Sequence, residues 1–89
     1  MKREKLVESA LSRTVSRLGG IAYKFVSPSR SGVPDRIVVM PGGRVSFVEV
    51  KAPGGVLSEL QKVEIARLRG LGAVVHVVWD QDGIDMVVA

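Results

Sequence analysis

Two apolar, β-branched segments separated by a glycine-rich break constrain the fold of this chain more than any other feature. They occupy residues 35–40 and 44–51, with Pro41-Gly42-Gly43 between them. Short strand-forming segments joined in this way are typical of a β-hairpin. With a three-residue loop centred on Gly42, Asp35 faces Glu49 across the hairpin. A two-residue Gly42-Gly43 turn would instead place Asp35 opposite Val50, so the register decides which side chains meet.

The rest of the chain alternates between helix-forming and strand-forming segments. Apolar residues recur at helical spacing before Gly19-Gly20, and Ser58 with Gln61 has the form of a capping box that begins a second helix. Residues 73–79 are almost continuously apolar, which predicts a central strand, and residues 80–83 predict a turn. The predicted elements are a helix at 2–18, strands at 21–26, 35–40 and 44–51, a helix at 58–71, and strands at 73–79 and 84–88.

This order, α-β-β-β-α-β-β, predicts the α/β class, with a mixed β-sheet flanked by helices. With 89 residues, the chain is expected to form a single domain spanning residues 1–89. It has no cysteine, which excludes disulfides and thiolate zinc sites, so a metal would need oxygen ligands or the single histidine.

The charge and hydropathy of the chain indicate its partners and its compartment. Thirteen Lys and Arg against nine Asp and Glu give a net charge of +4, a weak indication of a polyanionic partner. No apolar run approaches the ~20 residues of a membrane span, and no signal peptide follows the charged N-terminus. The protein is therefore expected to be soluble and cytoplasmic, without a membrane partner.

The hairpin brings together side chains that carry chemistry. In the three-residue-loop register, the Cβ atoms of Asp35 and Glu49 are expected to lie ~5 Å apart on one face of the sheet. Strand alternation places Lys51 on that same face. Two opposed carboxylates repel each other unless a divalent cation lies between them, and Mg²⁺ or Mn²⁺ prefers such oxygen ligands. A surface ion pair beside a turn aspartate would leave the opposed carboxylates unexplained.

These residues resemble a known nuclease signature. Pro34-Asp35 followed by Glu49-Val50-Lys51 is similar to the PD-(D/E)xK motif. The context, residues 31–35 together with Ser58 and Gln61, resembles the virus-type replication-repair nuclease (VRR-NUC) branch, and the likeness extends from Glu8 to Trp79. It implies a restriction-endonuclease-like fold and metal-dependent hydrolysis of phosphodiester bonds.

The resemblance also implies roles for individual residues. Asp35, Glu49 and the backbone carbonyl of Val50 would bind Mg²⁺ or Mn²⁺, and Lys51 would orient or activate the attacking water. Gln61 would line the site, although its place in a capping box is an alternative explanation. Glu8 would complete the site, with a second metal as one option and a solvated helix position as the other.

The family implies branched DNA, including Holliday junctions, as a substrate class, and DNA repair as a process. A homodimer is expected because cutting a symmetric junction needs two sites in fixed relation. Lys24, Arg30 and Ser31 could contact the DNA backbone or could be ordinary solvated residues. Trp79 and Phe47 are expected to pack, since four aromatics do not support a base-stacking platform. The alternative function is a catalytically inactive DNA-binding module with the same fold.

Overall fold

The computed structural model describes residues 3–89, in which three helices and four strands follow the order α-β-β-β-α-β-α. The elements are α1 (Arg3–Arg17), β1 (Ile21–Lys24), β2 (Arg36–Met40), β3 (Arg44–Val50), α2 (Glu59–Gly70), β4 (Val75–Val78) and α3 (Gln81–Val88). The predicted α/β class is confirmed. Residue 2, included in the predicted first helix, lies outside the described residues.

The hairpin has the register of the three-residue loop. Strands β2 and β3 pair antiparallel with Met40 opposite Arg44 and Arg36 opposite Val48. The loop closes through the amide of Gly43, which donates to the carbonyl of Met40 at 3.1 Å. Gly42 and Gly43 both have positive φ, the backbone region in which a residue with a side chain would be strained. The loop sequence therefore fixes the register on which the site depends.

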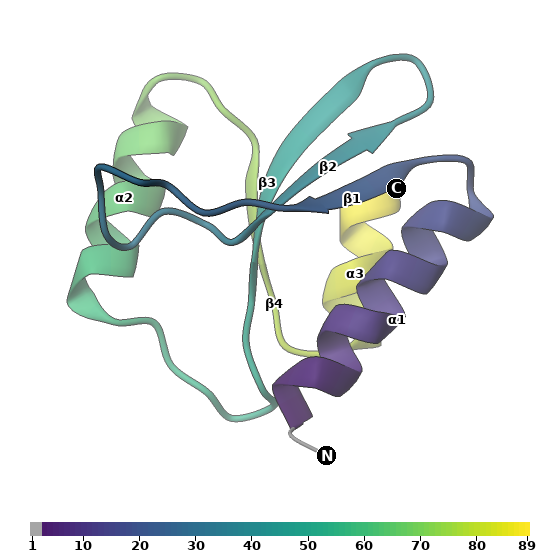
Figure 1. The fold of residues 1–89 in the computed structure, drawn as a ribbon, viewed down its shortest axis with the longest axis horizontal. Helices are drawn as coiled ribbons and strands as arrows, with labels where there is room; N and C mark the ends of the chain where they lie inside the picture. Colours follow the sequence, from purple (N-terminus) through teal and green to yellow (C-terminus); the bar gives the residue numbers. More distant parts are fainter. Residues whose placement is uncertain (1–2) are drawn as a thin grey trace.

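The sheet has the strand order β1-β2-β3-β4, and β4 runs parallel to β3. Helix α2 provides the crossover between these two parallel strands, as such a connection requires. The prediction that residues 73–79 form a central strand was wrong, because β4 lies at an edge of the sheet. The apolar residues of β4 are explained by helices on both faces of the strand, which bury it without a further neighbour (Figure 1).

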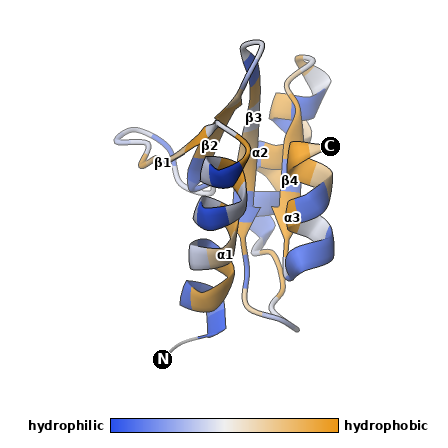
Figure 2. Cartoon of the chain, turned by 90° about the vertical axis from the view of Figure 1, so that its right-hand side faces the viewer, coloured by the Kyte–Doolittle hydropathy of each residue, from blue (hydrophilic) through white to orange (hydrophobic). Residues whose placement is uncertain are grey.

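The main core lies between the sheet and the two helices α1 and α3. Figure 2 shows the hydrophobic strands beside α1 and α3, whose hydrophilic residues lie on other sides of the helices. The core is built from side chains of both layers: Val7, Leu11, Val15, Val38, Met40, Val48, Val50, Val78, Ile84 and Val87. Helix α1 is thereby fixed against the sheet, so its first turns are held near the ends of β2 and β3.

The segment at 84–88, predicted as a strand, is part of helix α3. Asp80 caps this helix, and its side chain accepts a hydrogen bond from the amide of Gly83 at 3.1 Å. What reads as a turn at 80–83 is therefore a helix start. Ile84 and Val87 are buried at helical spacing and belong to the core with α1, which a strand with alternating side chains could not achieve.

In the described part of the chain, no helix has the length and apolar character to cross a membrane.

Candidate active site

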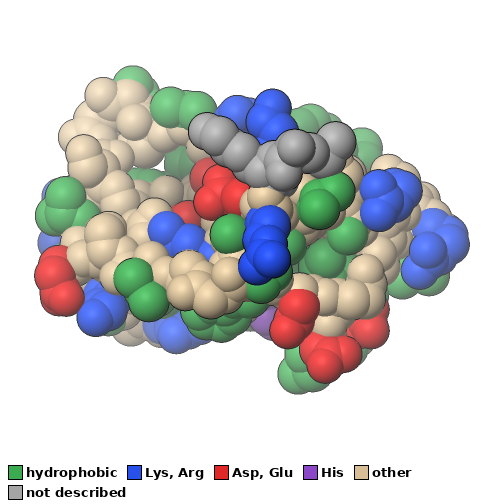
Figure 3. All heavy atoms as spheres, turned by 90° about the horizontal axis from the view of Figure 1, so that it is seen from below, with side chains coloured by type: hydrophobic (Ala, Val, Ile, Leu, Met, Phe, Trp, Pro, Cys, Tyr) green, Lys and Arg blue, Asp and Glu red, His purple; other side chains and the backbone are tan. Residues whose placement is uncertain are grey.

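The candidate site lies where β2 begins and β3 ends, beside the first turns of α1 and the start of α2 (Figure 1). The view in Figure 3 is directed at this end of the molecule, and acidic side chains near its centre are surrounded by Lys and Arg side chains. The arrangement follows from topology, since the antiparallel pairing brings the residue before β2 beside the last residues of β3.

Asp35 and Glu49 face each other as the hairpin register requires. Asp35 immediately precedes β2, one position beyond the paired Arg36 and Val48. Its carboxylate Oδ1 accepts a hydrogen bond from the amide of Val50 at 3.2 Å, which fixes the side chain against β3. Glu49 is 4% exposed, whereas the Asp35 side chain retains 30% exposure. One carboxylate is therefore buried and the other partly open to solvent.

The surroundings of Glu49 favour its neutral form. Burial, followed by the negative charge of Asp35, raises the pKa of Glu49 from 4.5 to about 7. Lys51 opposes this shift, and Glu4 adds to it. The pKa of a carboxyl group rises when the group is buried beside other carboxylates. A cation placed between the carboxylates would lower that pKa again.

The raised pKa of Glu49 predicts pH-dependent stability of the metal-free protein. The pKa of Glu49 is higher in the folded protein than in the unfolded chain. The contribution of protonated Glu49 to the free energy of unfolding is therefore fully present below pH 4.5 and is lost as the pH rises through 7. The loss is at most about 3 kcal/mol. In EDTA, the melting temperature should fall between pH 5 and pH 8, and Mg²⁺ at pH 8 should restore it. A Glu49→Gln variant that keeps the full native pH dependence would contradict this assignment.

Lys51 and Gln61 both approach the buried carboxylate. The ammonium nitrogen of Lys51 lies 4.0 Å from Oε2 of Glu49, and the Lys51 side chain is 17% exposed. The amide Nε2 of Gln61 donates to the same oxygen at 3.1 Å. Glu49 thus has a cation and an amide donor on one oxygen, an arrangement that holds the carboxylate in a single orientation.

Gln61 also completes the capping box of α2. The side-chain Oε1 of Gln61 accepts a hydrogen bond from the backbone amide of Ser58 at 2.9 Å. The backbone amide of Gln61 donates to Oγ of Ser58 at 3.1 Å. The structure thus contains both the cap and a contact between Gln61 and Glu49, whereas a functional role of Gln61 stays a prediction. One end of the side-chain amide caps the helix while the other end contacts Glu49.

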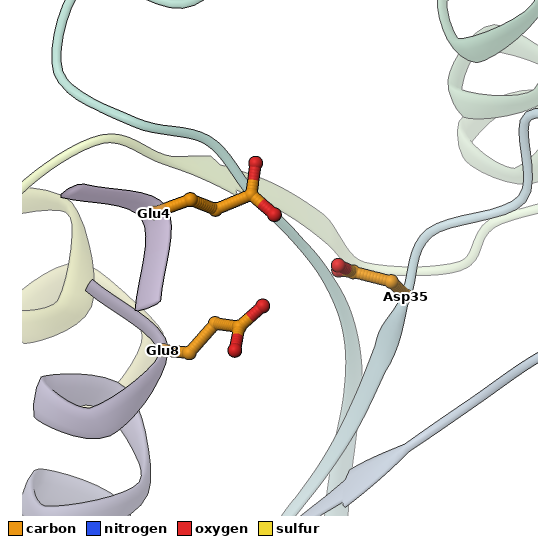
Figure 4. Close-up of side chains that lie close together, drawn as sticks. All are labelled: Glu4, Glu8 and Asp35. Carbon is orange, nitrogen blue, oxygen red and sulfur yellow. The ribbon is translucent and has the colours of Figure 1, made fainter. Parts of the chain in front are cut away.

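An acidic cluster on α1 adjoins Asp35. Oxygen atoms of Glu4, Glu8 and Asp35 lie within 4.8 Å of one another, and Figure 4 shows the three side chains pointing toward a common point. Sequence reasoning identified Glu8 but missed Glu4. The signal was available, because residues four apart lie on the same face of a helix.

Arg36 is the second residue that sequence reasoning missed. Its side chain is 8% exposed and lies 3.1 Å from Oε1 of Glu8 and 3.5 Å from Oδ2 of Asp35. It also donates to the Asp35 carbonyl at 2.9 Å. Arg36 therefore ties α1 to the start of β2. No local pattern distinguished it, since strand alternation simply places it on the face opposite Asp35.

The ligands at this end of the sheet suit a hard divalent cation. Asp35 lies across the hairpin from Glu49, and burial, followed by the negative charge of Asp35, raises the pKa of Glu49. A cation bound there would offset this negative charge. The site offers oxygen atoms and, in the described residues around it, no thiol or imidazole. Mg²⁺ or Mn²⁺ matches this donor set.

The loop before Asp35 packs closely on the start of α2. Gly32 has a φ of +86°, and a Cβ there would lie 2.6 Å from the backbone of Leu60. Only glycine allows this contact, which helps to place α2 and Gln61 beside Glu49. Of the three predicted DNA contacts, Lys24 and Ser31 are exposed and Arg30 lies 3.5 Å from Oε1 of Glu64.

Comparison with known proteins gives consistent results. The family model described as the VRR-NUC domain matches residues 3–79. "Putative nuclease p44" of Acyrthosiphon pisum secondary endosymbiont phage 1 is 52% identical over 80 residues, which cover 90% of this chain and 86% of that protein. A solved structure described as a VRR_NUC domain has a TM-score of 0.89 and 33% identity, covering 98% of this chain and 95% of that chain.

Proposed function

Because the chain belongs to the VRR-NUC family of nucleases, we propose that residues 1–89 act as a single metal-dependent domain that cuts branched DNA. The observation that carries this proposal is the convergence of Asp35, Glu49 and Lys51 at one end of the sheet, with Gln61 bonded to Glu49. This set combines oxygen ligands for a divalent cation with a cationic group for the reacting phosphate.

In the proposed mechanism, the carboxylates of Asp35 and Glu49 and the carbonyl of Val50 hold Mg²⁺ or Mn²⁺. The bound cation supplies Lewis-acid polarisation and increases the acidity of water. Lys51 orients the attacking water and offsets the negative charge that develops at phosphorus. Gln61 holds the Glu49 carboxylate in place, and Glu8, through Arg36, positions Asp35.

The DNA backbone would be bound by the basic excess of the chain. The net charge of +4 supplies a salt-sensitive attraction that does not depend on base sequence. Lys24 is the last residue of β1, and Arg30 and Ser31 lie in the loop before Asp35; we propose these exposed residues as contacts of the DNA backbone. Selection of a branched target would then depend on the shape of the DNA rather than on reading base edges.

A homodimer is part of this proposal, and the sheet has a face that could support one. Six apolar residues of β1, β2 and β3 share a face by register: Ile21, Tyr23, Ile37, Val39, Val45 and Phe47. Ile21, Tyr23 and Val45 are each more than half exposed, because α2 packs toward β4. A second copy would bury this face and supply the second site that a two-fold symmetric junction needs. Sedimentation of the native chain should give a dimer and that of Tyr23→Glu a monomer.

The function is tested by cleavage of labelled duplex, flap, splayed-arm and four-way-junction DNA in Mg²⁺, Mn²⁺ or EDTA. Metal-dependent cutting with preference for a branched substrate is the expected result. Equal cutting of duplex would contradict structure selectivity, and cutting in EDTA would contradict metal dependence. Salt-sensitive binding without cleavage in any metal would favour a DNA-binding module.

Replacement of Gln61 by alanine is expected to lower both activity and stability. Loss of the Nε2 donor frees the Glu49 carboxylate to reorient, and loss of the cap removes about 1 kcal/mol from the stability. Ser58→Ala is the matched control, because it weakens the same cap without removing the contact with Glu49. We expect kcat to fall several-fold in Gln61→Ala only. Equal kcat in the two variants would confine Gln61 to the capping role.

A further inference from the structure

A hollow beside the candidate active site has no part in the mechanism described above. It lies between the first turns of α1, the segment after β3 and the start of α3, and its volume is about 320 Å³. Its walls are largely apolar, and its rim carries polar side chains. Its lining includes Arg3, Leu6, Pro53, Trp79, Asp80 and Gln81.

Two residues that line the hollow, Pro53 and Trp79, lie close along the chain to Lys51 or to its backbone partner Val78. The amide of Lys51 donates to the carbonyl of Val78 at 2.9 Å, and Trp79 is the next residue along the chain. Pro53 follows Lys51 by two residues, a reach of at most ~7 Å. With a phosphate of the cut strand at Lys51, the neighbouring nucleotide would lie near Pro53 and the hollow that it lines.

Trp79 is held in a way that suits a binding surface. Its indole Nε1–H donates to the carbonyl of Gly55 at 2.7 Å, which fixes the ring against the segment between β3 and α2. The residue nevertheless remains 37% exposed. A fixed aromatic ring with an open surface is the feature on which unpaired bases stack in single-strand-binding proteins.

The residues around the hollow include one carboxylate, Asp80, and one cation, Arg3. The side chain of Asp80 accepts from the amide of Gly83, and that of Gln81 donates to Thr14 and Asp85. Both side chains are thus bonded within the protein. Arg3 is the cationic residue of the rim, and a guanidinium suits the phosphate attached to a bound nucleoside.

We propose that this hollow binds one unpaired nucleobase of the DNA strand that is cut, with Trp79 as the stacking residue. The inference rests on the proposed nuclease function and adds a basis for its selectivity. Fully paired duplex keeps its bases stacked, whereas a branch point offers bases that leave the stack at little cost. The proposal needs only one aromatic ring, not the series of rings that a base-stacking platform has.

The test combines protein variants with abasic DNA. The native cleavage position is first mapped on the preferred branched substrate. Abasic residues are then placed at each of the two nucleotides on either side of that position. For native protein, one abasic substitution should lower kcat/KM by about 10-fold. Trp79→Ala should show a similar loss on intact DNA and no further loss on that abasic DNA.

Two further variants separate base binding from effects on folding. Trp79→Phe keeps an aromatic face but loses the bond to Gly55, so it should retain most activity and most of the abasic effect. Leu6→Glu introduces a charge at an exposed position of the hollow, and Met86→Glu does so at an exposed position outside it. Leu6→Glu should reduce cleavage by about 10-fold, whereas Met86→Glu should cut normally.

The outcomes distinguish this inference from the proposed function. If native protein cuts no DNA with any metal, the nuclease proposal fails. If native protein cuts every abasic substrate as well as intact DNA, the base-binding proposal is overturned while the nuclease stands. Independent, multiplying losses from Trp79→Ala and the abasic residue would also overturn it, because Trp79 would then act only through the segment it anchors.

Discussion

Lys51→Ala should abolish DNA cleavage while metal and DNA binding persist. The ammonium lies 4.0 Å from Oε2 of Glu49 and supplies the positive charge near the reacting phosphate in the proposed mechanism. Loss of such a group costs at least ~10²–10³-fold in kcat. The measurements are single-turnover cleavage of a labelled branched substrate, fluorescence anisotropy for DNA binding and calorimetry with Mn²⁺.

The matched control is Lys62→Ala, which removes an exposed lysine that pairs with Glu59 on α2. It should cut like the native protein, since its exposed side chain pairs with Glu59 and not with Glu49. Lys51→Arg tests whether charge alone is sufficient, and partial recovery is expected because the larger guanidinium keeps the charge with different geometry. Native cleavage rates in Lys51→Ala would show that this lysine has no catalytic role.

The second large effect is expected from Asp35→Asn. Asparagine keeps an oxygen that can accept from the amide of Val50, so the fold should be retained. It removes the charge needed to bind the cation. Metal affinity should therefore fall by more than the ~10–100-fold that is typical when a residue hydrogen-bonded to a metal ligand is replaced. Cleavage should be lost, and DNA binding should be unchanged or tighter because a negative charge near the phosphate is gone. Calorimetry and anisotropy measure both effects.

The same variant should also change the ionisation of Glu49. The charge of Asp35 is the second-largest cause of the raised pKa of Glu49, after burial. Asp35→Asn should therefore lower that pKa and weaken the pH dependence of stability in EDTA. Asp85→Asn, on the exposed side of α3, is the control and should behave as native. Metal affinity equal to that of the native chain in Asp35→Asn would remove Asp35 from the ligand set.

The sequence predicted correctly those parts of the fold that depend on a few neighbouring residues, and it failed where packing against distant elements decides the structure. The hairpin register and the start of α2 were confirmed, because a glycine loop and a capping box act within a few residues. The place of β4 and the nature of α3 were wrong, because both depend on packing against distant elements. Ile84 and Val87 are apolar in either structure, and only contact with α1 selects the helix.

Prediction of the candidate site had a similar limit. Strand pairing was enough to bring Asp35 and Glu49 together, and alternation added Lys51. The approach of α1 to the sheet depends on the whole core, so the contact of Arg36 with Glu8 was not readable from the sequence. Glu4 was missed although its spacing to Glu8 places both on one face of the helix. The side-chain roles themselves remain predictions that the proposed variants would test.

Because the Gln61 side chain both caps α2 and bonds to Glu49, fraying of the first turn of α2 would also change the orientation of the Glu49 carboxylate. Its amide leaves Glu49 if the first turn of α2 unwinds, and that turn is held mainly by the capping box and by the contact of Gly32 with Leu60. Helix ends open at a lower free energy than the core. Warming should therefore inactivate the enzyme before the sheet unfolds, so thermal inactivation would report the opening of one helical turn rather than loss of the fold.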